Sequence, residues 1–330
     1  MTKTLDFVKG HAGFDEILLL YGDQCEPGTE LEVGPPLLFK PSLGAVEAGF
    51  LYPPERDGDI KIRMIDSTSC NYITMCGGLT QVVGKAIVES DIGRYFNIKV
   101  TEPRTEVKIE TDSGSIPITV EVSNGKANKV WTNATSYVEE CYALGVRPVQ
   151  IGGLYSFAVG IDPPKLEFLV VKVDEIENLY PGVDFWAKTP ASLDALADIY
   201  HRFMLQEHIP DKFLYGAFYD LRAEGAGNGR AMYRFYPTDF QESTPTEMTC
   251  GTGTLAIGVT MAANGDIPPD GYHRMLFEVG SQKIVGRKQM FTELTLKTAN
   301  RRVVDARFSH SLIELLATGK VYTSITSQIL

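Results

Sequence analysis

Met75-Cys76-Gly77-Gly78-Leu79-Thr80-Gln81-Val82-Val83-Gly84 returns in the second half of the chain as Thr249-Cys250-Gly251-Thr252-Gly253-Thr254-Leu255-Ala256-Ile257-Gly258. Both stretches begin with Cys-Gly and reach an apolar residue followed by glycine at the same distance from the cysteine. Each Cys-Gly pair is followed by residues typical of a buried helix. The repeat therefore predicts two related halves, each with one cysteine where a loop enters a helix.

Most of the remaining sequence has the pattern of β-strands. Alternating or continuous β-branched residues occur at 17–21 and 60–64 and through the series 96–130, which Ser123-Asn124-Gly125 interrupts with residues typical of a hairpin turn. Helical patterns are fewer, at 80–89, 192–206 with Ser192 as N-cap, 254–263 and 309–316. Long runs of strands around a few helices indicate the α+β class.

The composition excludes several classes of function. The chain has 330 residues, 44% of them hydrophobic, with a formal net charge of −11 and a pI near 5.0. No basic stripe is available to bind a phosphate backbone, so we expect no nucleic-acid partner. The N-terminus lacks the apolar core of a signal peptide, and no run approaches the roughly 18 apolar residues of a membrane span. We therefore expect a soluble, cytoplasmic protein with no membrane partner.

Five cysteines, an odd number at irregular spacing, do not form a disulfide framework. We expect Cys25, Cys70 and Cys141 to be small core residues. At a helix start, unpaired N–H groups and the helix dipole favour the thiolate and lower the pKa of a thiol, so Cys76 and Cys250 are candidate bases.

The glycines in the two stretches indicate close approach. Gly77, Gly78, Gly251 and Gly253 allow backbone N–H groups to reach a ligand and to hold a carboxylate. Gly84 and Gly258 lie inside the predicted helices, where each costs about 1 kcal/mol relative to alanine. A glycine at such a position is typical of a helix packed closely against a neighbouring helix or sheet.

Two thiols on opposite sides of a small pocket suit one reaction in particular. Racemisation at the carbon α to a carboxylate removes a proton from one face and delivers one to the other, so it needs a base and an acid. A thiol pair with one member ionised can run this reaction in both directions. Two related halves, each with one such cysteine, could supply this pair.

These residues resemble the proline racemase family, within the broader diaminopimelate epimerase-like fold. Tyr72-Ile73-Thr74-Met75-Cys76-Gly77 resembles the family's first catalytic segment and Cys250-Gly251-Thr252-Gly253-Thr254 its second. Gly152-Gly153-Leu154-Tyr155 and, in shortened form, Phe277-Glu278-Val279-Gly280-Ser281 are similar to two further blocks of the family in the expected order. Phe7-Val8-Lys9-Gly10-His11-Ala12-Gly13 is similar to the start of diaminopimelate epimerases.

The resemblance implies two pseudo-symmetric α+β halves, each a curved, mostly antiparallel sheet around a central helix, with the active site in the cleft between them. The first half would span 1–150 with the C-terminal segment from about 310 to 330, and the second 151–309. It also implies a racemase or epimerase that needs no cofactor, neither pyridoxal phosphate nor a metal, and that can form a homodimer. Cys76 and Cys250 would exchange acid and base roles, and the substrate-binding residues would be Gly77, Gly78, Gly251, Thr252 and Phe240.

Two departures from the family bear on the substrate. Gly78 stands where proline racemases have histidine, and neutral Thr246 stands where they have the aspartate that binds the substrate ammonium. Losing a charge-assisted bond to an amine disfavours proline as substrate. Glu247 could replace the lost carboxylate from the neighbouring position.

Three functions therefore stay open. The first is an amino-acid racemase or epimerase acting on a small carboxylate other than proline. The second is an allylic isomerase or a dehydratase of a small carboxylic acid on the same scaffold. The third is a relative that binds a ligand without catalysis.

Overall fold

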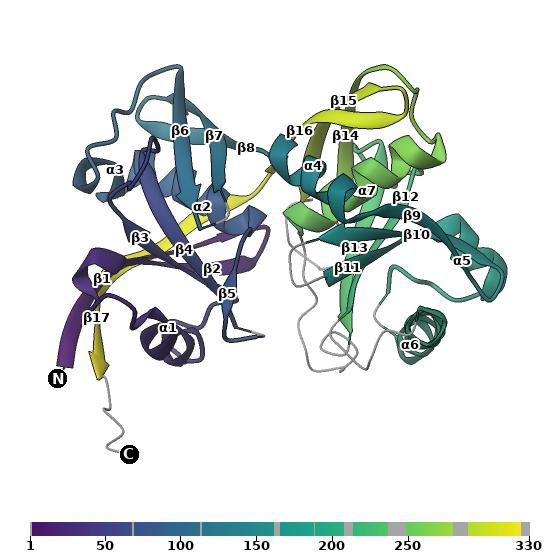
Figure 1. Ribbon diagram of the computed structural model, residues 1–330, viewed down its shortest axis with the longest axis horizontal. Coiled ribbons are helices and arrows are strands. Elements are labelled where there is room, and N and C mark those ends of the chain that lie inside the picture. Colours follow the sequence, from purple (N-terminus) through teal and green to yellow (C-terminus); the bar gives the residue numbers. More distant parts are fainter. Residues whose placement is uncertain are drawn as a thin grey trace. The chain divides into compact units, whose positions relative to one another are not determined.

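The computed structural model describes residues 2–67, 69–112, 114–161, 166–187, 189–207, 214–236, 249–279 and 290–324 (Figure 1). It forms two units: unit 1 runs to Asn133 and resumes at Ser309, and unit 2 is Ala134–Phe308. We expected the division near residue 151. It lies earlier because α4 (Thr135–Leu144) packs on β10 (Leu154–Ile161) and β9 (Val146–Ile151) pairs with β10, so both belong to unit 2.

Unit 1 is a mixed sheet in which antiparallel pairs predominate. In Figure 1 β17 (yellow) lies along β1 (purple), and the two pair antiparallel. From β1 the order continues β2, β3, β4, β6, β7 and β8, with β2–β3 and β4–β6 parallel and the other pairs antiparallel. The strands are β1 (Thr2–Ala12), β2 (Asp15–Tyr21), β3 (Glu47–Tyr52), β4 (Ile60–Asp66), β5 (Tyr72–Ile73), β6 (Arg104–Thr111), β7 (Gly114–Ser123), β8 (Lys126–Asn133) and β17 (Ile313–Ser324). The helices are η1 (Gly22–Gln24), α1 (Glu30–Leu38), α2 (Gly77–Glu89) and α3 (Ile92–Tyr95).

Unit 2 repeats this order of pairings. From β10 to β15 the successive neighbours are antiparallel, parallel, antiparallel, parallel and antiparallel, as they are from β1 to β7 when the short β5 is left out. The further strands are β11 (Leu166–Lys172), β12 (Leu214–Asp220), β13 (Gly229–Tyr236), β14 (Gly271–Val279), β15 (Phe291–Ala299) and β16 (Arg302–His310). The helices are α5 (Val173–Leu179), α6 (Pro190–Gln206) and α7 (Gly251–Asn264). The predicted α+β class and the relation between the halves are confirmed, with two parallel pairs in each sheet.

The central helices α2 and α7 are buried around most of their circumference. α2 packs against β1, β7, β8 and β17 of unit 1, and α7 packs against β10, β11, β12 and β15 of unit 2. The close packing expected at the internal glycines is against the sheets. A Cβ on Gly84 would lie 2.6 Å from Val130 Cγ1, and one on Gly258 would lie 3.0 Å from Leu294 Cδ2.

A buried glutamate closes matching turns in the two units. Glu110 on β6 accepts backbone N–H bonds of 2.8 Å from three residues of the turn before β4: Glu55, Arg56 and Gly58. Glu278 on β14 accepts bonds of 2.6–3.0 Å from the turn before β13: Glu224, Gly225 and Gly227. The last residue of each set is glycine because a Cβ there would lie 2.4 Å from Glu110 Cγ or 2.8 Å from Glu278 Cγ. We call these two arrangements the glutamate clamps.

Two local predictions differ from the structure. Residues 309–316 form the end of β16 and the start of β17 instead of a helix, because backbone pairing with β1 holds this segment extended. The N-cap of α6 is Thr189, with Pro190 in the first turn and Ser192 completing a capping box.

The Asn124-Gly125 hairpin is confirmed, with φ of 52° and 67° at the two turn residues.

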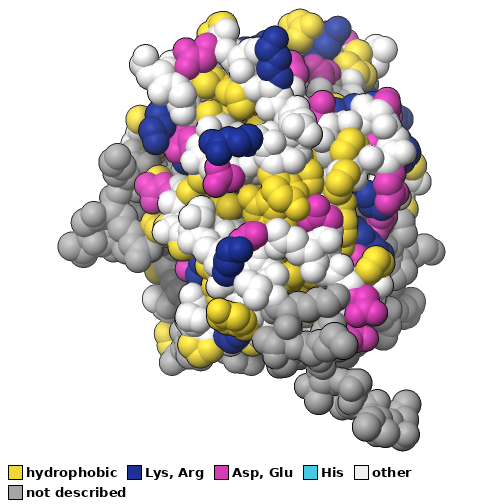
Figure 2. Space-filling model, turned by 90° about the vertical axis from the view of Figure 1, so that its left-hand side faces the viewer, with side chains coloured by type: hydrophobic (Ala, Val, Ile, Leu, Met, Phe, Trp, Pro, Cys, Tyr) yellow, Lys and Arg dark blue, Asp and Glu magenta, His cyan; other side chains and the backbone are white. Residues whose placement is uncertain are grey.

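The surface carries no large region of one charge on the face of unit 1 in Figure 2, where basic and acidic side chains alternate around a hydrophobic centre. Among the helices that the structure describes, none is long and apolar enough to cross a membrane.

Alanine substitution distinguishes the two internal helix glycines. We expect Gly84→Ala to destabilise the protein by about 1–2 kcal/mol, because the new methyl group meets β-branched Val130 and Ile118, and overpacking outweighs the gain in helix propensity. Gly258→Ala should change stability by less than about 1 kcal/mol, because its neighbours are leucine tips that can rotate. Urea unfolding followed by circular dichroism measures both. Equal costs would show that packing against the sheet does not separate the two positions.

The clamp in unit 1 makes stability depend on pH. Burial by itself raises the pKa of Glu110. The bonds from the N–H groups of Glu55, Gly58 and Arg56 lower this pKa by a larger amount, so the pKa of Glu110 lies below the ordinary 4.5. Stability gained from the ionised form is present above pH 4.5 and is lost as pH falls. We expect Glu110→Gln to lower Tm by several degrees at pH 7, with the difference from wild type narrowing toward pH 3.

The control for this measurement is Glu106→Gln, which removes the same charge from an exposed position of β6. Differential scanning calorimetry at several pH values should show little change for this variant. If the Tm of Glu110→Gln lay below that of wild type by the same amount from pH 7 to pH 3, the role of the ionised carboxylate would be contradicted.

Candidate active site

Cys76 and Cys250 occupy equivalent positions at the starts of α2 and α7. Each is the N-cap residue, with φ and ψ of −134° and 119° at Cys76 and −137° and 116° at Cys250. The Cys76 Sγ accepts the N–H of Leu79 at 3.2 Å, and the Cys250 Sγ accepts the N–H of Gly253 at 3.3 Å. Both residues are buried. A hydrogen bond from an N–H group favours the thiolate, so the local geometry suits acid–base chemistry at both sulfurs.

The threonine four positions after each cysteine forms hydrogen bonds that stabilise the helix start. Thr80 Oγ1 donates to the carbonyl of Gly77 at 2.8 Å and contacts Thr132 Oγ1 at 2.9 Å. Thr254 Oγ1 donates to the carbonyl of Cys250 at 2.6 Å and contacts the Tyr233 hydroxyl at 2.7 Å. These buried bonds hold each cysteine at a fixed position on its sheet.

The residues expected to bind the substrate carboxylate form the first turns of the two helices. Gly77 and Gly78 follow Cys76, and Gly251 and Thr252 follow Cys250, ahead of the first backbone bonds to the cap carbonyls. N–H groups at these positions have no partner inside a helix and can receive an anion. Thr252 Oγ1 also lies 3.2 Å from the Cys250 Sγ.

Two carboxyl groups flank Cys76 in unit 1. Asp15 begins β2 and Glu47 begins β3, and these strands pair in parallel. The ligand atoms of Asp15, Glu47 and Cys76 all lie within 4.8 Å of one another. Gly78 leaves the room this requires, because a Cβ there would lie 2.8 Å from Asp15 Oδ2.

Burial makes the Asp15 carboxyl group a weaker acid than it is in water. Burial raises the pKa of Asp15 to about 7, a hydrogen bond with Glu47 opposes this rise and the charge of Glu16 adds to it. Asp15, Glu47 and Cys76 form a donor set that could hold a metal ion. Binding a metal would require loss of the proton on the pair, because metal ligands must be deprotonated.

Aromatic side chains surround the start of α7 in unit 2. The ring centroids of Phe168 and Tyr215 are 5.2 Å apart, and those of Tyr215 and Phe235 are 4.8 Å apart. A Cβ on Gly253 would lie 2.6 Å from the Tyr233 ring and 3.2 Å from Phe168, so the helix start packs directly on these rings. The two cysteines thus share a cap geometry, and the described residues beside their helix starts differ.

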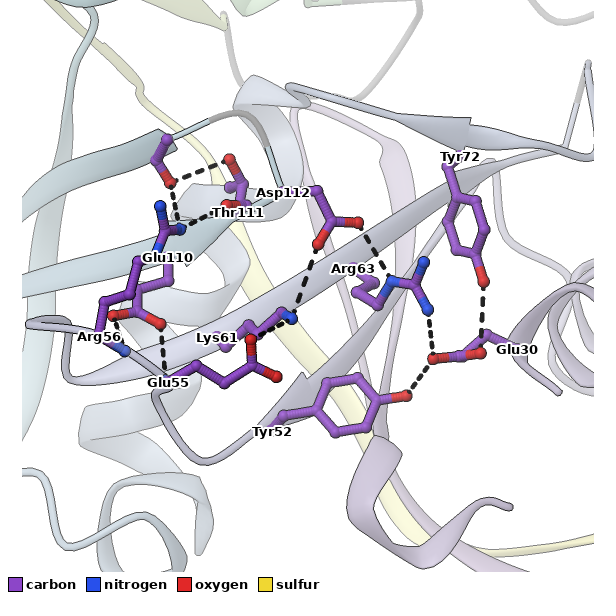
Figure 3. Close-up of polar contacts among 11 residues, drawn as sticks. Glu30, Tyr52, Glu55, Arg56, Lys61, Arg63, Tyr72, Glu110, Thr111 and Asp112 are labelled. Atoms are coloured by element: carbon purple, nitrogen blue, oxygen red, sulfur yellow. Dashed lines mark hydrogen bonds and ion pairs between the residues drawn. The ribbon is translucent and has the colours of Figure 1, made fainter. Parts of the chain in front are cut away.

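A polar network holds the strand that leads to Cys76 (Figure 3). Buried Glu30 accepts bonds from the Tyr52 hydroxyl at 2.7 Å, Arg63 at 2.8 Å and the Tyr72 hydroxyl at 3.3 Å. Arg63 also stacks on the Tyr72 ring, with its guanidinium carbon 4.2 Å from the centroid, and pairs with Asp112. Burial raises the pKa of Glu30, but a backbone N–H and the bonds from Tyr52 and Arg63 lower it below its ordinary value. The network ties β5 to α1 and β4.

The other predicted site residues have different outcomes. Phe240, Thr246, Glu247, Gly280 and Ser281 lie outside the described residues. Cys25 and Cys141 are buried as expected, and burial raises the pKa of Cys141 to about 12. Cys70 is exposed in a turn with φ of 52°, so the prediction of a core position was wrong there.

Asp15 and Glu47 were missed by the sequence analysis. A signal for Asp15 was present: alternation along β2 puts it on the same face as the buried Ile17 and Leu19. Glu47 gave no comparable signal, because only its pairing with β2 brings it to this face.

Comparisons with known proteins bear on the family. No family model matches the chain. A trans-L-3-hydroxyproline dehydratase from Saccoglossus kowalevskii is 29% identical over 139 residues, which cover 42% of this chain and 37% of that protein. A 4-hydroxyproline 2-epimerase from Streptosporangium roseum is 26% identical over 270 residues, 78% of this chain and 74% of the relative.

Solved structures share the fold over the whole chain. A hydroxyproline epimerase from Agrobacterium vitis superposes with a TM-score of 0.63 at 15% identity, covering 99% of this chain and 93% of its own. Methylitaconate-delta-isomerase gives a TM-score of 0.63 at 13% identity, covering 100% of this chain and 98% of its own. These likenesses show that the chain has the fold of hydroxyproline epimerase and of methylitaconate-delta-isomerase, and its sequence relatives are a hydroxyproline epimerase and a hydroxyproline dehydratase.

Proposed function

We propose that this protein is a racemase or epimerase in which Cys76 and Cys250 exchange a proton with the carbon α to a substrate carboxylate. The observation that carries the proposal is the same thiol cap, with an N–H group bonded to the sulfur, at matching helix starts of two matching units. The epimerase among the sequence relatives and the epimerase among the solved structures support this reaction class.

The proposed mechanism uses only groups of this chain. N–H groups of Gly77, Gly78, Gly251 and Thr252 bind the carboxylate and stabilise the negative charge that develops when the α-proton leaves. One cysteine as thiolate accepts that proton, and the other as thiol donates its own to the opposite face. The reaction requires the two sulfurs to address opposite faces of one substrate. Both proton positions are supplied by thiols, so the step needs neither pyridoxal phosphate nor a metal.

The proposed substrate is a small carboxylate with an acidic α-hydrogen, other than proline. Thr246 stands at the position of the family's ammonium-binding aspartate, and a neutral hydroxyl gives a weaker bond to an amine than a carboxylate does. We propose that Glu247 binds the amine instead or that the substrate carries no cationic amine at this position.

A second candidate is a directional proton transfer, as in an allylic isomerase or a dehydratase. The observation that favours it is the difference between the carboxyl pair beside Cys76 and the aromatic rings at the start of α7, because unequal partners suit a reaction in which proton removal and proton donation occur at different atoms. The dehydratase among the relatives and methylitaconate-delta-isomerase among the solved structures add support.

Proton NMR in D2O separates these candidates. The enzyme is incubated with L- and D-amino acids and with small unsaturated acids. We expect an α-proton signal of one amino acid to disappear and its enantiomer to accumulate. Exchange at an allylic carbon with a shifted double bond would establish the second candidate, and absence of exchange throughout would contradict both.

Serine substitution tests the two thiols with the substrate so identified. We expect Cys76→Ser and Cys250→Ser each to reduce inversion by about 10²–10⁴-fold, because a hydroxyl is a far weaker acid than a thiol and cannot serve as the general base. The matched control is Cys70→Ser, which changes an exposed cysteine of unit 1 and should retain full activity. Wild-type inversion by either of the first two variants would rule out the thiol pair.

A further inference from the structure

A cavity of about 240 Å³, a volume that includes open solvent, lies in unit 2 toward the end of α7. Its lining comes from β10, β11, α5, β12 and α7 and includes Phe157, Val170, Lys172, Glu175, Tyr219 and Thr260. Thr260 stands ten residues after Cys250, which is about 15 Å along the helix axis. The cavity therefore lies away from the thiol that begins the same helix.

The glutamate clamps give the register between the two units at this place. Each clamp glutamate pairs with a cation of the neighbouring strand, Lys61 in unit 1 and Arg230 in unit 2. Across the next ladder these two residues face Tyr52 and Asp220. One residue earlier on β3 and β12 stand the equivalent residues Leu51 and Tyr219.

Strand pairing extends this correspondence from β3 and β12 to β2 and β11, and from there to β1 and β10. On and directly after the central helices, equivalent residues lie at equal distances from Cys76 and Cys250. The equivalent pairs around the cavity are Leu51 and Tyr219, Tyr21 and Lys172, Leu19 and Val170, Val8 and Phe157, Ala86 and Thr260, and Ile92 and Asp266.

In unit 1 this place is a filled hydrophobic core. All six of its residues belong to one cluster of buried side chains. Phe96, which follows α3, belongs to the same cluster, and its ring stacks on Tyr21 with the centroids 6.1 Å apart. Unit 2 has no counterpart of α3 in the segment between α7 and β14, all of which the structure describes.

In unit 2 the same place is polar. Lys172 Nζ donates to one oxygen of Asp266 at 2.9 Å, and the Tyr219 hydroxyl donates to the other at 2.7 Å. Asn264, which also lines the cavity, donates its amide N–H to Asp266 at 2.9 Å. Asp266 thus holds three polar side chains together where unit 1 has the apolar side chain of Ile92.

Thr260 is the second polar feature of the cavity. Its side chain is 1% exposed, and among the residues that the structure describes its hydroxyl has no hydrogen-bond partner. A buried hydroxyl in this state destabilises a protein, a cost that Ala86 avoids at the equivalent position of unit 1. A ligand that gives the hydroxyl a partner removes this cost.

The charges at the cavity favour a cation. The charge of Lys172 is balanced by Asp266, so Glu175 leaves one negative charge. The rings of Tyr155 and Phe157, which line the cavity too, lie edge to face with centroids 5.5 Å apart, and an aromatic face attracts an ammonium ion. The last turn of α7 adds the partial negative charge of a helix C-terminus.

We propose that this cavity is a binding site for a small primary ammonium ion, with the Thr260 hydroxyl and the Glu175 carboxylate as acceptors. An ammonium group donates up to three hydrogen bonds and therefore suits two oxygen acceptors in one cavity. Because a water molecule takes about 30 Å³ in the liquid, the space suits a cation of a few heavy atoms. The inference is independent of the proposed function and would stand if neither cysteine were catalytic.

Methylammonium chloride is the probe. The Tm of the full-length protein is measured at pH 7 by differential scanning calorimetry at increasing probe concentration. Sodium chloride and tetramethylammonium chloride at the same ionic strength are the references, and tetramethylammonium has the same charge but no N–H group. We expect only methylammonium to raise Tm, by about 1–3 °C at ten times its dissociation constant, because it binds the folded state.

Two substitutions locate the binding. Thr260→Val keeps the size of the side chain and removes its hydroxyl, so we expect a higher Tm without the probe and no shift with it. Glu175→Gln should also lose the shift. The matched control is Glu177→Gln, which removes the same charge from an exposed position of α5 and should keep the full shift.

Three results would overturn the inference. A cavity that holds only water would give wild-type Tm values that are equal in methylammonium and sodium chloride. A full shift in both Thr260→Val and Glu175→Gln would place the binding elsewhere. A lower Tm of folded Thr260→Val without the probe would show that the hydroxyl already has a partner. If Thr260→Val does not fold, Glu175→Gln measured against Glu177→Gln decides alone.

Discussion

The enclosure of one helix by its own sheet is the constraint on which each unit depends. A helix buried on most sides cannot turn its first N–H groups to water, yet those groups need hydrogen-bond partners. At the starts of α2 and α7 a cysteine sulfur supplies one acceptor, and the following small residues leave room for a ligand to supply others. The packing that stabilises the fold therefore places each cysteine at a buried position where a backbone N–H favours the thiolate.

Much of this could be predicted because the repeat is local. The cysteine caps, the tightly packed glycines in the two helices and the Asn124-Gly125 hairpin all follow from residues within one short stretch. The helix predicted for 309–316 was wrong for the opposite reason. The apolar spacing of this segment is compatible with a helix, and only pairing with the distant β1 makes it a strand. Asp15 and Glu47 meet through a parallel pair with α1 between them in the chain, so no sequence window contains both.

The two units illustrate how one scaffold gives two chemical environments. Their backbones repeat the same ladder order and the same cap, and their side chains differ at the positions facing the helix start. In the described residues, acids lie beside the cysteine of one unit and aromatic rings beside the helix start of the other, while the cap geometry of the sulfur is the same in both. A fold with internal symmetry can thus present two different sets of side chains beside one kind of helix start.

The glutamate clamps bear on the ancestry of this arrangement. Each clamp combines three backbone bonds to one carboxylate with a glycine at the same place in the turn. Independent origin of this combination in both halves would require several matching changes. Descent from a single duplicated gene explains it more simply. After such a duplication the clamps would have been retained as shared framework, and the residues beside the helix starts would have been free to diverge. The difference between the side chains beside the two cysteines would then be younger than the fold that carries them.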